Sequence, residues 1–149
     1  MRLQDKVVFV TDADSPSGKA LIPRLRQAGA RLLLASDSNG AALASVLEAG
    51  REQGDPAIVG RIDPCDGTQI GELLDRADRL WGAVDVLVHN RSLVKPASVE
   101  TSEEALFREL LDMNAKSAFV AAQTVGARMA ARGSGAILFI GSIHAEKPT

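Results

Sequence analysis

Lys6-Val-Val-Phe-Val-Thr11 is a short apolar run rich in β-branched residues, and it decides how the rest of the chain is interpreted. Runs of this kind are typical of strands buried on both faces of a parallel sheet. Outward from it, residues 16–29 carry apolar side chains at helical spacing, and Gly29 stands where a helix would end. This part of the sequence therefore predicts a buried strand followed by a helix, the opening unit of an α/β fold.

The same unit recurs along the chain. Further strands are predicted at 31–35, 57–62, 84–88 and 136–140, with helices at about 39–53, 70–81 and 102–132. Thr101 and Glu104 have the spacing of a capping box at the start of the last helix. This alternation implies one Rossmann-like domain over residues 1–149, a doubly wound parallel α/β sheet with helices on both faces. We expect the strand order 3-2-1-4-5.

The composition excludes several classes of protein. The formal net charge is -2, without a basic block, so we expect no nucleic-acid partner. The apolar runs are too short to span a bilayer, so no membrane segment is expected. Cys65 is the only cysteine, which rules out an intrachain disulfide and a four-thiolate metal site. These features predict a cytoplasmic protein without a metal centre.

Ligands of open parallel sheets bind beyond the carboxyl ends of the strands, where the winding direction reverses. The loops after Thr11, Val88 and Ile140 should therefore surround one crevice. This places the candidate site before any motif is considered.

The order of several segments resembles the short-chain dehydrogenase/reductase family from Leu3 to the last residue. The similar segments are the first strand, Asp63, Asp85-Val-Leu-Val-His-Asn90, Asp112-Met-Asn114 and Gly135-Ala-Ile-Leu-Phe-Ile-Gly-Ser142. The resemblance implies NAD or NADP as cofactor and hydride transfer to or from a small carbonyl or alcohol substrate. It implies catalytic positions at Asn114 and Ser142, and cofactor-binding positions at Ser15, Gly18, Ser36, Asp37, Asp63 and Asn90.

The glycine-rich turn of that family is altered here. Thr11-Asp-Ala-Asp-Ser-Pro-Ser-Gly18 keeps only its last glycine. Pro16 lacks an N–H, and Asp12 and Asp14 place negative charge where a pyrophosphate would approach the helix N-terminus. Ser15 and Pro16 also suit an N-cap and a first helical position. A well-capped helix and a poor phosphate site are compatible.

Arg91 stands where the family has a small residue in the cofactor cleft. It could fill the cleft and pair with Asp12 or Asp14, it could bind a cofactor phosphate, or it could be a solvated surface residue. At the end of the second strand, an acid at Asp37 after Ser36 favours NAD over NADP, because a carboxylate repels a 2′-phosphate. Asp37 is equally plausible as a turn residue.

The family's catalytic Tyr-x-x-x-Lys should follow Ser142 closely, and this chain contains no tyrosine. We therefore expect a chain truncated before that motif, inactive and weak in cofactor binding. The alternatives are an active enzyme whose remaining residues lie beyond this sequence, and a non-catalytic scaffold or regulatory module using the old cofactor cleft. An open edge at 136–140 and an apolar face on the 102–132 helix, with Phe119, Val125 and Met129 among its residues, predict a homo-oligomer formed through that helix.

Histidine and cysteine are two further residue types that could carry chemistry in this chain. His89 and His144 follow neighbouring strands and could, with Glu146, form a metal or acid/base site, although no third ligand is supported. Cys65 has no basic neighbour in sequence, which favours a packed, unreactive thiol.

Overall fold

The computed structural model describes residues 3–36, 41–44, 47–48 and 57–142. Its centre is a five-stranded sheet in the order β3-β2-β1-β4-β5. Each neighbouring pair is parallel. The strands are β1 (Val7–Val10), β2 (Arg31–Ser36), β3 (Ile58–Arg61), β4 (Val86–His89) and β5 (Ala136–Phe139). The predicted fold class and strand order are confirmed.

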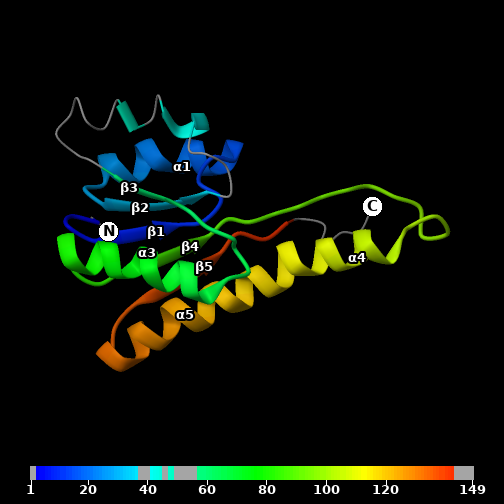
Figure 1. Cartoon of the computed structure of the whole chain (residues 1–149). Helices are drawn as coiled ribbons and strands as arrows, with labels where there is room; N and C mark the ends of the chain where they lie inside the picture. The colour runs from blue at the N-terminus through cyan, green and yellow to red at the C-terminus, as the bar shows by residue number, and fades with distance from the viewer. Residues whose placement is uncertain (1–2, 37–40, 45–46, 49–56, 143–149) are drawn as a thin grey trace.

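The helices cover both faces of this sheet, with α1 on one face and α3 and α5 on the other (Figure 1). They are α1 (Pro16–Gln27), the 3-10 turn η1 (Ala41–Leu43), α3 (Gly67–Leu80), α4 (Glu104–Leu111), the π turn η2 (Asp112–Lys116) and α5 (Ser117–Arg132). Most of the helix predicted at 39–53 lies outside the described residues.

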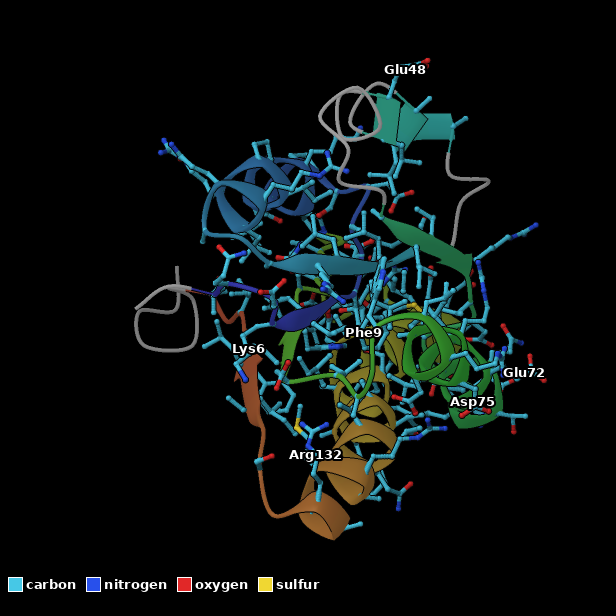
Figure 2. All side chains as sticks on the ribbon, turned by 90° about the vertical axis from the view of Figure 1, so that its left-hand side faces the viewer. Lys6, Phe9, Glu48, Glu72, Asp75 and Arg132 are labelled. Atoms are coloured by element: carbon cyan, nitrogen blue, oxygen red, sulfur yellow. The ribbon has the colours of Figure 1, made fainter. Side chains whose placement is uncertain are left out.

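Successive side chains of β1 point to opposite faces of the sheet, so the hydrophobic core has two parts. Val7 and Phe9 pack with α3 and α5 in one cluster, whereas Val8 and Val10 pack with α1 in the other. Phe9, labelled in Figure 2, lies between the sheet and the helices and is fully buried. Because both faces of the strand are covered, it has no polar alternation, as its sequence predicted.

The predicted helix at 102–132 needs two corrections. It begins at Glu104, and its N-cap Glu103 makes no side-chain capping hydrogen bond. The Thr101–Glu104 capping box is therefore not formed, because Glu104 is itself the first helical residue and pairs with Arg108 one turn later. A π turn also separates α4 from α5, where Ser117 Oγ donates to the Met113 carbonyl at 2.5 Å.

Apolar side chains are exposed at the far end of the molecule from α1. The segment 91–103 and α4 project from the sheet (Figure 1), and α4 has no buried residue. Phe119 is 65% exposed, whereas Val125 and Met129 are buried against the sheet. β5 is the edge strand, and all its residues are exposed.

Candidate functional site

The turn that follows β1 is built to start α1. Ser15 is the N-cap of α1, its Oγ accepts a 3.0 Å hydrogen bond from Gly18 N, and Pro16 opens the helix. A Cβ on Gly18 would stand 2.6 Å from the Asp12 carbonyl oxygen, so only glycine fits there. The predicted capping roles of Ser15 and Pro16 are confirmed, and the retained glycine serves the close approach of helix and turn.

Arg91 closes the cleft between the ends of β1 and β4. Its Nη1 lies 3.0 Å from Asp12 Oδ1, and both side chains are only 14% exposed. Its Nη2 lies 3.2 Å from Met113 Sδ in the π turn. Of the three alternatives for Arg91, the structure shows the pair with Asp12, and its burial contradicts the solvated surface position.

Little space remains behind this ion pair. The cavity there has a volume of about 10 Å³, roughly the room that one water molecule needs. It is lined by Thr11, Asp12, Ala35, Ser36, Ile62, Pro64 and Arg91. The Asp12–Arg91 pair thus lies beside the turn that leads into α1, the part of this type of fold to which a pyrophosphate usually binds.

Asp14 lies at the carboxyl end of β2. Its Oδ2 accepts a 2.6 Å hydrogen bond from Ser36 Oγ, and Ser36 is buried. Asp37, the other residue predicted for cofactor selection, lies outside the described residues.

Asn90 joins β4 to the first turn of α1. Its Oδ1 accepts a hydrogen bond from Ser17 Oγ at 3.1 Å, and its Nδ2 donates to Ser15 Oγ at 3.0 Å. Its backbone N–H donates to Thr11 Oγ1 at 3.0 Å. Asn90 is thus buried and holds the loop that would carry a cofactor, while direct contact with a cofactor stays a prediction.

His89, the last residue of β4, is buried in a polar network. Its Nδ1 lies 3.2 Å from Thr11 Oγ1, and its Nε2 lies 3.4 Å from Ser117 Oγ. Its ring meets Phe139 edge to face at 5.9 Å. Burial, and secondly the charge of Arg91, lower the pKa of His89 below 6.5, so the ring is neutral at neutral pH.

The two predicted catalytic residues lie on different elements. Asn114 in the π turn accepts from Leu93 N at 2.7 Å and donates to Leu93 O at 2.9 Å, which clamps the loop after β4. Ser142 is exposed and follows β5. Their catalytic roles stay predictions.

Asp63 lies beside a wider opening. A cavity of about 470 Å³ is lined by Arg61, Ile62, Asp63, Pro64, Gln69 and Met113. Asp63 Oδ1 accepts from Cys65 N at 2.8 Å, and Cys65 Sγ donates to the Asp112 carbonyl at 3.2 Å. Burial is the main cause that raises the pKa of Cys65, so its thiol is protonated and weakly nucleophilic.

Sequence reasoning missed Met113 and Ser117 as neighbours of Arg91 and His89. The local signal for both was weak, because the π turn that brings them inward had no sequence signature.

Within the described ranges, no group of three or more His, Cys, Asp or Glu side chains could hold a metal ion. His144 and Glu146 lie outside those ranges. None of the helices in the described part of the chain is long and apolar enough to cross a membrane.

Many proteins have a parallel sheet with a capped helix after its first strand. Comparison with known sequences distinguishes among them. The family model described as short chain dehydrogenase matches residues 6–149. The chain belongs to this family. Cis-4-hydroxycyclohexanecarboxylate dehydrogenase of Sinomonas cyclohexanicum is 31% identical over 140 residues, which cover 93% of this chain and 55% of the relative.

Solved structures extend the likeness of this chain to the family. A gluconate 5-dehydrogenase from Burkholderia cenocepacia in complex with NADP and tartrate has a TM-score of 0.87 and 27% identity, covering 99% of this chain and 58% of that one. A 7α-hydroxysteroid dehydrogenase complexed with NADH and 7-oxo glycochenodeoxycholic acid has a TM-score of 0.88 and 30% identity, covering 99% and 57%. The chain spans a little over half the length of these relatives.

The residues of this chain fit a nicotinamide dinucleotide unevenly. At the adenosine end there are an open cavity beside Asp63 and a carboxylate at the end of β2. In the turn before α1, where this type of fold binds a pyrophosphate, Asp12 is paired with Arg91 and Pro16 offers no N–H donor. The described residues therefore leave more open space beside Asp63 than behind the Asp12–Arg91 pair.

Proposed function

We propose that this chain is the cofactor-domain part of an NAD(P)-dependent oxidoreductase for small carbonyl or alcohol substrates, and that the 149-residue chain itself binds dinucleotides weakly. The observation that supports weak binding is the little-exposed ion pair between Asp12 and Arg91, beside the turn where a pyrophosphate is expected to bind. A pyrophosphate would have to displace the Asp12 carboxylate, at the cost of separating a partly desolvated pair. NAD is favoured over NADP because the acid at Asp37, which follows Ser36 in the sequence, would repel a 2′-phosphate.

The proposed affinity can be tested with a matched pair of variants. For the parent chain we expect dissociation constants above roughly 0.1 mM for NADH and NADPH, equivalent to less than about 5.5 kcal/mol. Asp12→Gly should tighten NADH binding by about tenfold or more, because it removes the charge and relieves a backbone φ of 50°. Calorimetry measures both.

Asp5→Gly is the control, because Asp5 also has a positive φ, 60°, and also pairs with an arginine. It lies at the other end of β1, so NADH affinity should not change. Micromolar binding of NADH by the parent chain would contradict the proposal. Equal effects of the two variants would show that relief of backbone strain, and not the cleft, is responsible.

Asn114 and Ser142 are proposed as the family's catalytic asparagine and serine. Without the family's tyrosine, proton transfer to the developing alkoxide has no assigned donor, a contribution typically worth about 10²–10⁴-fold. We therefore expect no change in nicotinamide absorbance when the chain is incubated with NADH and a panel of carbonyl compounds. Turnover that Ser142→Ala abolishes would show that another donor has replaced the tyrosine.

A non-catalytic scaffold or regulatory module is the second candidate function, favoured by the nearly filled cavity behind Arg91.

The cytoplasmic location stays a prediction. We also propose a homo-oligomer through α4 and α5, supported by the exposure of Phe107, Leu111 and Phe119. Light scattering at micromolar concentration tests it, and a stable monomer near 15.7 kDa would contradict it.

A further inference from the structure

A cavity of about 370 Å³ lies between α3, α5 and the residues that lead into β4. The buried side chains of Leu74, Val84 and Val125 line it. Because the strands are parallel, the residues before β4 and the last turns of α5 lie at the amino end of the sheet. The cavity is therefore at the opposite end of the sheet from the Asp12–Arg91 pair, and its volume is typical of small-molecule sites.

Arg132, the last residue of α5, brings a positive charge to this cavity and is labelled in Figure 2. Its Nη2 donates to the carbonyls of Val84 at 2.8 Å and Ser134 at 3.1 Å, and its Nε donates to Ser134 Oγ at 3.0 Å. These partners are uncharged. Within the described part of the chain, Arg132 forms no ion pair and its Nη1 makes no hydrogen bond. The guanidinium is thus held in place while its charge is not neutralised.

The other two charged residues that line the cavity are paired with each other. Arg128 Nη1 lies 2.9 Å from Asp78 Oδ2, and Arg128 Nη2 lies 2.7 Å from Asp75 Oδ1. Arg128 therefore has two acidic partners, whereas Arg132, one helical turn later, has uncharged ones. The charge that a ligand would meet in this cavity is that of Arg132.

We propose that this cavity binds a small monocarboxylate with a hydrocarbon chain, such as a short fatty acid. The carboxylate would lie on Arg132, because a planar guanidinium presents N–H donors in the geometry that a carboxylate accepts. The hydrocarbon chain would lie against the buried leucine and valine side chains, where Ala83 and Ala131 leave space. This inference does not require that a nucleotide binds, because it concerns the other end of the sheet.

The charges of the cavity explain why the ligand should be a monoanion. One guanidinium without an acidic partner balances one negative charge. A phosphate dianion would keep an excess of negative charge close to the Asp78 carboxylate, and an ammonium group would be repelled by Arg132. The hydrogen bonds that already orient Arg132 favour binding, because the ligand does not have to immobilise the side chain.

The test titrates the full chain with butanoate, hexanoate and octanoate and follows the methyl resonances by NMR. Octanoate should bind with a dissociation constant of about 1 mM or lower. Each methylene added to the ligand and buried in the cavity should tighten binding by up to about fourfold. Octylamine, which has the same length and the opposite charge, should bind at least about tenfold more weakly than octanoate. The methyl groups of Val84 and Val125 should show the largest shifts.

Arg132→Gln removes the charge and keeps an N–H donor for the Val84 carbonyl. It should weaken octanoate binding at least about tenfold and abolish the preference for octanoate over octylamine. Arg79→Gln is the matched control, because it removes the same charge from an exposed residue of α3 that does not line the cavity. It should change the affinity by less than about twofold. Equal losses in the two variants would overturn the inference, because overall charge would then explain the binding.

A second pair of variants tests the apolar part of the cavity. Ala131→Leu should fill space in the cavity and weaken octanoate binding at least about tenfold. Ala130→Leu makes the same change at an exposed neighbour that does not line the cavity, and octanoate affinity should not change. Thermal unfolding of each variant verifies that it is folded. Equal effects of these two variants would also overturn the inference.

Two results with the parent chain would contradict the proposed site directly. The first is no binding of octanoate up to about 10 mM. The second is a set of shifts centred on Phe107 and Phe119, which would assign octanoate to the exposed apolar side chains of α4 and α5. The affinity of the chain for NADH affects only the proposed function, so the two failures are distinguishable.

Discussion

The two ends of β1 carry the same pair of residue types in different surroundings. Asp5 before the strand has a φ of 60°, and Asp12 after it has a φ of 50°; among the described residues, only these two non-glycine residues have positive φ. The Asp5 carboxylate lies 3.2 Å from Arg31. The Asp12 carboxylate lies 3.0 Å from Arg91.

The two ion pairs differ in their exposure to solvent. The side chains of Asp5 and Arg31 are 67% and 39% exposed, whereas those of Asp12 and Arg91 are both 14% exposed. Water screens the first pair, at the amino end of the sheet, so it contributes little. The second lies at the carboxyl end, where parallel sheets bind their ligands, and water screens it less, so we expect its removal to affect stability more.

Replacing the arginine of each ion pair by alanine should give the largest difference in stability between the two ends of β1. Arg91→Ala should lower the free energy of unfolding by about 2 kcal/mol, because it leaves the Asp12 carboxylate partly buried without its counter-charge. Arg31→Ala should cost less than about 0.5 kcal/mol. Urea denaturation measures both, and equal losses would remove the distinction.

The double variant Asp12→Ala/Arg91→Ala sharpens this result. If the loss comes from an uncompensated charge, removal of the acid as well should restore part of the stability. A double variant less stable than Arg91→Ala would instead assign the loss to packing of the arginine side chain.

His89 should make the carboxyl end sensitive to acid. Because burial lowers the pKa of His89 below 6.5, the unfolded chain binds its proton first as the pH falls. The free energy of unfolding should therefore decrease as the pH falls from 6.5 toward the folded-state pKa. This part of the pH dependence should be absent in His89→Gln, whose stability at pH 7.5 should be lower by about 1 kcal/mol through weaker bonds to Thr11 and Ser117. Identical pH profiles would contradict it.

A substitution at the amino end of β1 should have the smallest effect on the free energy of unfolding. Lys6 lies 3.2 Å from Asp85 and is 54% exposed, at the edge of the molecule in Figure 2. Lys6→Gln should cost less than about 0.5 kcal/mol, and 1 M NaCl should abolish the difference, because the Debye length is then about 3 Å. The Arg91→Ala loss should persist in the same salt. A salt-sensitive Arg91 pair would mean that the cleft is wetter than its exposure indicates.

Features set by neighbouring residues could be predicted from the sequence. The apolar run of β1 and the start of α1 at Ser15 and Pro16 depend on periodicity and local hydrogen bonding. The strand order could be predicted because strands and helices alternate along the chain. The capping box at Thr101 is the exception, because the first turn of α4 begins at Glu104 and that carboxylate pairs along the helix.

The contents of the candidate site required the tertiary structure. Three partners were compatible with Arg91, and the choice of Asp12, 79 residues earlier in the chain, depends on how β1 and β4 place their following loops. The bond from Ser36 to Asp14 depends likewise on the turn lying over β2. The sequence alone predicts a doubly wound sheet, because the patterns of buried strands and capped helices are local and their alternation limits the topology. Packing decides which charges meet at the carboxyl edge of that sheet, because side chains far apart in sequence become neighbours only when the strands align.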